Sequence, residues 1–203
     1  MKRLVVLFLI SGIVFLFSIS NASAIGLGAY YQLGWGKADW EWDDNGTMYD
    51  DSLDHRSRLP GFVLDTNVAQ DQVFNYRLQL GLDQIKFDGG GKATGYVMDH
   101  IFGFGVVRNE FMRLWVGPQL HLSYYDDADG DSDFRLFGLG GGPAVGVNIH
   151  AGDTVSFCIT NGFLLSSQLG EAANGFDFSG YETLFYINFS VLFRINDAYR
   201  PYN

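Results

Sequence analysis

The feature that most constrains the fold is a long alternating run near the end of the chain, over residues 181–194. One row of this run is apolar apart from Thr183, and it holds Tyr181, Phe185, Ile187, Phe189, Val191 and Phe193. The other row is mixed and includes Glu182. A period of two predicts a β-strand with one apolar face. Because the run exceeds the roughly 9–11 residues that a tilted strand needs to cross a bilayer, we interpret it as the closing strand of a membrane barrel.

The N-terminus has the pattern of a secretory signal peptide. Lys2 and Arg3 precede an almost unbroken apolar stretch over residues 4–19, and Ala22-Ser23-Ala24 has the small residues of a cleavage site. A membrane-anchor helix is the alternative, but the stretch is short for a span. We therefore expect residues 1–24 to be a signal peptide and the mature chain to begin at Ile25.

Composition favours a β-barrel over a helical membrane protein. No later stretch is continuously apolar over the roughly 18 residues that a transmembrane helix requires. The chain nevertheless has 26 Gly, only 4 Pro and 16% aromatic residues. Its formal net charge of −10 argues against a nucleic-acid partner, which requires a basic surface. The single cysteine, Cys158, cannot form an internal disulfide and is expected to fill a strand position.

Alternation predicts eight strands between residues 25 and 195, in one outer-membrane β-barrel domain. The predicted strands are 26–40, 56–66, 73–87, 94–107, 111–125, 134–149, 154–167 and 181–194. The connections are alternately short (67–72, 108–110, 150–153) and longer or more acidic (41–57, 88–93, 126–133, 168–178). This is the pattern of an all-β, antiparallel, up-and-down transmembrane barrel. A soluble lipocalin-like barrel is the alternative, but its outer surface would need more Lys and Glu than the Gly-rich polar rows contain.

Two features depart from the regular pattern. The alternation of the third strand slips near Gln84, which predicts a bulge or the membrane edge at that residue. A short C-terminal tail, residues 196–203, follows the last strand.

The arrangement of strands and turns over the mature chain resembles the small eight-stranded outer-membrane protein families, namely the opacity-like and OmpW-like barrels and the membrane domain of OmpA. Members usually end on an aromatic residue that the barrel assembly machinery recognises, and Phe193 matches it, although residues 196–203 extend past it. The resemblance implies a monomer in the bacterial outer membrane. Its implied partners are outer-membrane lipid, lipopolysaccharide and the barrel assembly machinery.

Charged residues on the inward rows form a predicted polar network in the lumen. They are Arg77, Asp83, Asp99, Arg113, His121 and Glu182. Counting across the hairpins places Asp99 near both His121 and Asp83. Buried charges must be paired, so the cluster is either a proton-linked gate or catalytic pair, or a plug that fills the lumen. The plug is favoured because an eight-stranded barrel is just wide enough for its own side chains.

Two further motifs suggest chemistry. His121 and Ser123 lie two residues apart on one strand face, as a His-x-Ser pair of lipid A deacylases would. However, their parity places them in the lumen, and Arg135 occupies the region where an acid is expected. The loop 126–133 has acids at alternate positions, of which Asp127, Asp129, Asp131 and Asp133 are candidate calcium ligands. The loop lacks the twelfth-position Glu of an EF-hand, so a solvated acidic loop is favoured, with weakly bound surface Ca²⁺ as the only cofactor expected.

The sequence therefore predicts an integral outer-membrane barrel with a structural or surface-interaction role and a plugged or narrow lumen, and no enzymatic activity. A narrow channel for small or apolar solutes, implied by the OmpW-like resemblance, is the first alternative. A lipid A-modifying acyl hydrolase is the second.

Overall fold

The computed structural model describes residues 25–44, 47–69, 72–126, 134–172 and 177–195. It forms eight strands: β1 (Ile25–Asp44), β2 (Thr47–Thr66), β3 (Phe74–Phe87), β4 (Lys92–Arg108), β5 (Met112–Asp126), β6 (Phe134–Ala151), β7 (Val155–Ala172) and β8 (Asp177–Ile195). The predicted signal peptide, the four candidate calcium ligands and the predicted tail lie outside the described residues. None of the described segments is a helix long and apolar enough to cross a membrane.

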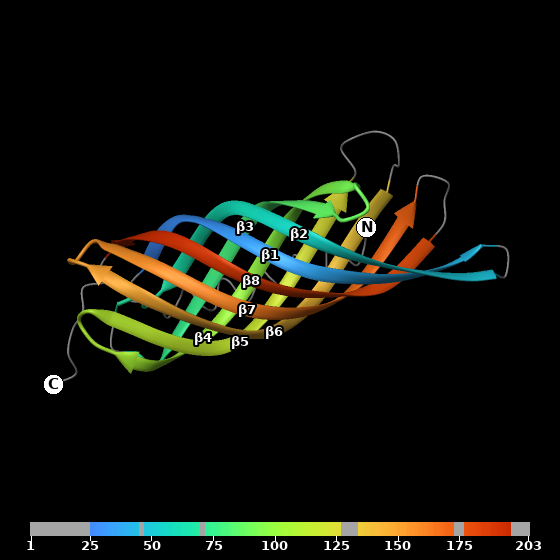
Figure 1. The fold of residues 1–203 in the computed structure, drawn as a ribbon. Helices are drawn as coiled ribbons and strands as arrows, with labels where there is room; N and C mark the ends of the chain where they lie inside the picture. The colour runs from blue at the N-terminus through green and yellow to red at the C-terminus, as the bar shows by residue number, and fades with distance from the viewer. Residues whose placement is uncertain (1–24, 45–46, 70–71, 127–133, 173–176, 196–203) are drawn as a thin grey trace.

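The strands pair in sequence order as antiparallel neighbours, and β1 pairs with β8 to close the ring (Figure 1). The closing register runs from Ile25 opposite Ile195 to Trp42 opposite Phe178. The predicted eight-stranded up-and-down barrel is thus confirmed, with residues 181–194 inside its closing strand.

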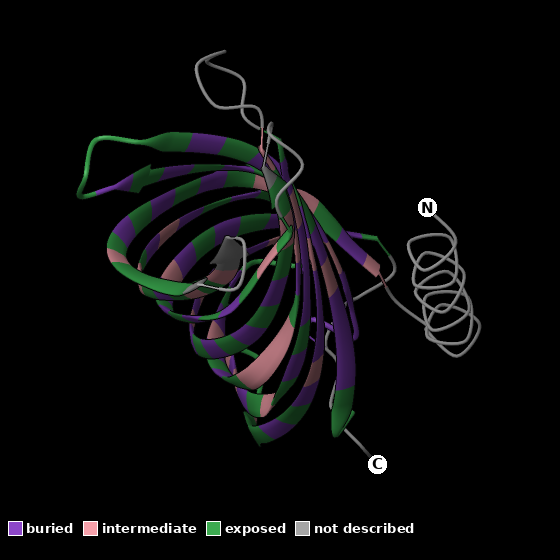
Figure 2. Ribbon diagram, turned by 90° about the vertical axis from the view of Figure 1, so that its right-hand side faces the viewer, coloured by how far each residue is buried: buried purple, intermediate pink, exposed green. Residues whose placement is uncertain are grey.

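Buried and exposed residues alternate along most of each strand (Figure 2), although β3, β4 and β5 each contain a run of three buried residues. The exposed row is apolar, running on β1 from Leu27 to Trp35 and on β8 from Phe185 to Ile195. On β3 it runs from Phe74 to Leu82, with Tyr76 in the same row but buried. These lengths match the roughly 9–11 residues of a tilted membrane-spanning strand. The lipocalin-like alternative required the apolar row to face inward, so it is wrong. The outward band is the surface of a transmembrane barrel.

At the end with the longer connections, the strands extend beyond the sequence-based boundaries. Most of the predicted loop 41–57 belongs to a β1–β2 hairpin that projects past the neighbouring strands (Figure 1). Most of the predicted loop 168–178 belongs to β7 and β8. The alternation could not reveal these extensions because both of their faces are largely polar. Cross-strand contacts accompany the pairing instead, such as Trp42 stacked on Tyr49 with ring centroids 5.8 Å apart.

Of the two interpretations of the slip near Gln84, the bulge is wrong, whereas the membrane edge agrees with the structure, because the outward apolar row of β3 ends at Leu82. The β3–β4 register continues unbroken from Leu82 opposite Tyr96 to Lys86 opposite Lys92. The apolar positions move from the outward to the inward face near Gln84, because Ile85 and Phe87 point into the lumen. At the end with the longer connections, the lumen is lined by apolar side chains. In the described pairings, a register shift occurs between β4 and β5, at Gly105 and Val107.

A charge on the outward band should destabilise the barrel according to its depth. We expect Phe189→Arg, near the middle of the band on β8, to lower the free energy of unfolding by about 2–4 kcal/mol. Ser179→Arg, on the same face of the same strand but above the band, is the matched control and should change it little. Urea unfolding of the refolded protein in lipid vesicles measures both, and equal effects would contradict the assigned membrane band.

Candidate functional site

The structure places all six predicted lumen residues inside the barrel. Arg77, Asp83, Asp99, Arg113, His121 and Glu182 are each buried. They do not form one network, however, but lie at several levels along the lumen, each with its own partners. The partners decide what the interior can do.

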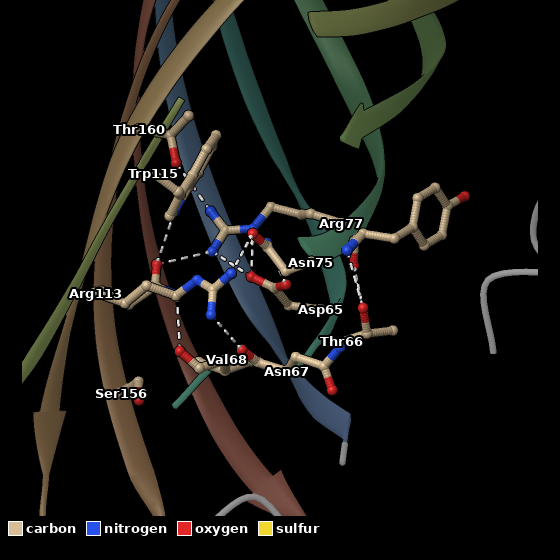
Figure 3. Close-up of polar contacts among 12 residues, drawn as sticks. Asp65, Thr66, Asn67, Val68, Asn75, Arg77, Arg113, Trp115, Ser156 and Thr160 are labelled. Carbon is tan, nitrogen blue, oxygen red and sulfur yellow. Dashed lines mark hydrogen bonds and ion pairs between the residues drawn. The ribbon is translucent and has the colours of Figure 1, made fainter. Parts of the chain in front are cut away.

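The lower level, which is the one nearer the short turns, contains an ion pair between Arg77 on β3 and Asp65 on β2 (Figure 3). Arg77 Nε and Nη2 donate to Asp65 Oδ2 at 2.8 and 2.5 Å. The guanidinium also donates to Thr160 Oγ1 at 2.9 Å and Asn148 Oδ1 at 3.1 Å. It lies 5.1 Å from the ring centroid of Trp115, a cation–π distance. Each polar group of this buried pair is therefore compensated by a neighbour.

Arg113 connects this ion pair to the short-turn end of the barrel. Its Nη2 donates to Val73 O at 3.0 Å and to Asn75 Oδ1 at 3.3 Å, and its Nη1 donates to Asn67 O at 3.3 Å. Asn75 Nδ2 in turn donates to Asp65 Oδ1 at 2.9 Å. The arginine thus holds the β2–β3 connection over the lower end of the lumen.

The middle level contains the Asp99–His121 pair. These residues are opposite in register on β4 and β5, and His121 Nδ1 lies 2.7 Å from Asp99 Oδ1. Gln119 Nε2 donates to the same carboxylate oxygen at 3.0 Å. Tyr186 on β8 donates its hydroxyl to Gln119 Oε1. A continuous set of polar contacts therefore crosses the lumen from β4 to β8.

Asp83 lies at a higher level than Asp99, so the predicted proximity of these two carboxylates is wrong. Asp83 is opposite Gly95, whereas Asp99 is opposite Gln79. The offset arises because β4 begins at Lys92, two residues earlier than predicted, so the turn at 88–91 is shorter and the pairing shifts. Asp83 accepts hydrogen bonds from Ser57 Oγ at 2.6 Å and from Tyr125 Oη at 2.8 Å.

Glu182 has partners from two other strands. His55 Nε2 on β2 lies 2.9 Å from Glu182 Oε1, and Gln168 Nε2 on β7 donates to Glu182 Oε2 at 2.9 Å. Gln168 Oε1 accepts a hydrogen bond from Trp40 Nε1 at 2.6 Å. Above this level the interior becomes aromatic. Trp40 packs edge-on against Phe87 and Phe178 with centroids 5.4 and 5.9 Å away.

Glycines on the inward rows make space for the largest of these side chains. A Cβ at Gly146 would collide with the Trp115 ring, and a Cβ at Gly162 would collide with the Tyr186 ring. The Gly-rich sequence of β6 therefore corresponds to close packing in the lumen.

The His121–Ser123 pair lacks the contact that a hydrolase needs. Both side chains are buried in the lumen, away from the outward apolar band. His121 Nδ1 contacts Asp99, as the histidine of a triad does, but Ser123 Oγ has no hydrogen-bond partner among the described residues. An active serine requires a base within hydrogen-bonding reach. Within the part of the chain that the structure describes, no three His, Cys, Asp or Glu residues are grouped to hold a metal ion.

Sequence reasoning missed two ionisable partners, Asp65 and His55. Asp65 and Arg77 have inward parity on either side of the short connection 67–72 and are opposite in register, so parity could have paired them. The sequence pattern places His55 in the loop 41–57, because no local signal marks it as part of a strand.

Comparison with known proteins adds no argument about the fold or the activity of this chain. No family model matches the chain, and no curated protein matches it. Among solved structures, the outer membrane protease OmpT from Escherichia coli is similar, with 8% identity over 86% of this chain and 98% of that chain and a TM-score of 0.43. Neisserial surface protein A is similar over 79% and 98% of the two chains, with 11% identity and a TM-score of 0.29. Similarity at this level carries no argument about activity, so the description of the barrel rests on its own strand pairing.

Breaking the lower ion pair should be strongly destabilising. We expect Arg77→Met or Asp65→Leu alone to lower the free energy of unfolding by about 3–5 kcal/mol, because each leaves an unpaired buried charge. The double variant Asp65→Leu/Arg77→Met should lose much less free energy of unfolding than the sum of the losses in the two single variants. Urea unfolding in lipid vesicles measures the double-mutant cycle.

Lys37→Met provides the control for this cycle, since Lys37 pairs with Asp39 on the exposed surface at 3.2 Å. Such surface pairs contribute about 0–1 kcal/mol. An Arg77→Met barrel as stable as the wild type would contradict the assigned role of the ion pair.

Proposed function

We propose that this chain is a monomeric bacterial outer-membrane barrel with a plugged lumen, and that its role is structural or surface-interacting rather than enzymatic. The outward apolar band supports the membrane location, since alternating apolar-out and polar-in strands are typical of outer-membrane barrels. In this proposal the chain needs the barrel assembly machinery for insertion, and it has no resident cofactor.

The observation that carries the plugged lumen is hydrogen bonding between opposite walls. In a ring of eight strands, β3 and β7 face each other, and Arg77 Nη1 on β3 donates to Thr160 Oγ1 on β7. At the middle level, Tyr186 on β8 reaches Gln119 on β5. A path for a solute along the axis would have to break these contacts and leave buried charges without partners. The geometry therefore favours a plug over the alternative of a narrow channel.

The projecting β1–β2 hairpin supports a role at the surface. Its exposed acids include Asp39, Glu41, Asp50, Asp51 and Asp54. The free edge of β2 in this region is lined by charge, a feature that suppresses unwanted strand pairing. We propose that this end faces the cell exterior, because the chain extends furthest beyond the membrane band here, as it does on the extracellular side of such barrels.

Conductance tests the plugged lumen. We expect the folded wild-type barrel to be silent in a planar bilayer, because contacts between opposite walls close its axis. The double variant Asp65→Ser/Arg77→Ser removes only the lower contact between the walls, and it should stay silent as well, because Tyr186 and Gln119 still close the axis at the middle level. Heat-resistant electrophoretic mobility verifies folding in both cases. A steady, reproducible wild-type conductance would overturn the proposal and favour transport.

A further inference from the structure

Four cations lie together on the outward face of the barrel, at the edge of the apolar band towards the longer connections. This basic cluster consists of Arg56 and Arg58 on β2, Lys86 on β3 and Lys92 on β4, all exposed. Arg56 is opposite Lys86, and Lys86 is opposite Lys92. Three positive side chains therefore stand side by side on adjacent strands, although the chain as a whole has a net charge of −10.

The basic cluster is not neutralised by the described part of the protein. Its four residues form no ion pair within 4.0 Å with any described residue, whereas Lys37 on the same face is paired with Asp39. Asp54 and Asp88 lie beyond the cluster, on its side nearer the connections. Like charges directly opposite each other on neighbouring strands are destabilising. An external anion would remove this repulsion.

An apolar groove of about 810 Å³ begins directly below the basic cluster. Its lining includes Pro60 and Phe62 on β2, Leu80 and Leu82 on β3 and Tyr96 on β4. Pro60 follows Arg58 by two residues on the same face of β2. Phe62 and Tyr96 are 76% and 68% exposed, so the groove is accessible from the lipid phase. Cations above an apolar groove match an anionic headgroup above its acyl chains.

We propose that this face binds a phosphorylated glycolipid of the lipid A class, with its phosphates on the basic cluster and its acyl chains in the groove. The inference rests on the proposed outer-membrane location. Neighbouring strands are about 4.8 Å apart, so Arg56 and Lys92 are separated by about 10 Å. That width suits more than one phosphate on a sugar backbone. Arg binds phosphate through two parallel hydrogen bonds, and each cation near an anionic lipid surface adds to the affinity.

The test measures lipid retained by the full-length protein, purified from membranes and reconstituted in phosphatidylcholine nanodiscs. The probe is bisphosphorylated lipid A, titrated and counted by native mass spectrometry. We expect the variant Arg56→Gln/Arg58→Gln/Lys86→Gln/Lys92→Gln to bind it about tenfold more weakly or worse, because the phosphates lose their charged donors. The affinity of the double variant Lys86→Gln/Lys92→Gln for lipid A should lie between those of the fourfold variant and the wild type. The double variant provides the comparison with the wild type if the fourfold variant folds poorly.

Arg135→Gln is the matched control, because Arg135 is also exposed and near the connections but lies opposite Asp126 on the β5–β6 pair. It should bind lipid A as the wild type does. Equal retention by the wild type and the fourfold variant would overturn the site. So would equal binding of dephosphorylated lipid A or of phosphatidylglycerol, and so would complete displacement by millimolar inorganic phosphate. A conducting wild-type barrel that still retains lipid A would refute the plugged lumen alone.

Discussion

Closure of the β1–β8 ladder is the constraint on which the rest of the structure depends. With the ring closed, no strand edge remains in the membrane, where an unpaired backbone group would be very costly. Closure with eight strands also sets the lumen width, which leaves room only for side chains. Every inward position must therefore be filled, and every inward charge must find a partner. The glycine at position 146 beside Trp115 and the hydrogen bond from Arg77 to Thr160 both follow from that fixed width.

The interior is divided by charge along the barrel axis. Near the short turns, Arg77, Arg113 and Arg194 outnumber the single carboxylate of Asp65. Towards the longer connections, the buried carboxylates of Asp83, Asp99 and Glu182 share two histidines. Hydroxyl and amide donors complete their hydrogen bonding, which the low dielectric of a closed lumen requires. Side chains that cross between opposite walls thus hold the barrel together and close it.

Period-two alternation was sufficient to predict the barrel, the number of strands and the inward parity of all six charged residues. It also placed Asp99 near the level of His121, because the turn between β4 and β5 is short, although the exact pairing depends on the register shift at Gly105 and Val107. It failed where both faces are polar, as in the projecting part of β1 and β2, since no apolar period marks such strands. Contacts across the lumen, such as Tyr186 with Gln119, depend on how the ring closes, and one sequence contains no record of that.

The same alternation separates the charges with internal partners from those without them. An inward charge is buried in the lumen, so another residue of the chain must neutralise it, as Asp65 does for Arg77. An outward charge at the edge of the band faces lipid headgroups, and the chain need not neutralise it. Arg56, Lys86 and Lys92 stand side by side in that position, and only a partner outside the protein can offset their repulsion. For a barrel with a filled lumen, the outer surface is therefore where binding specificity is to be sought.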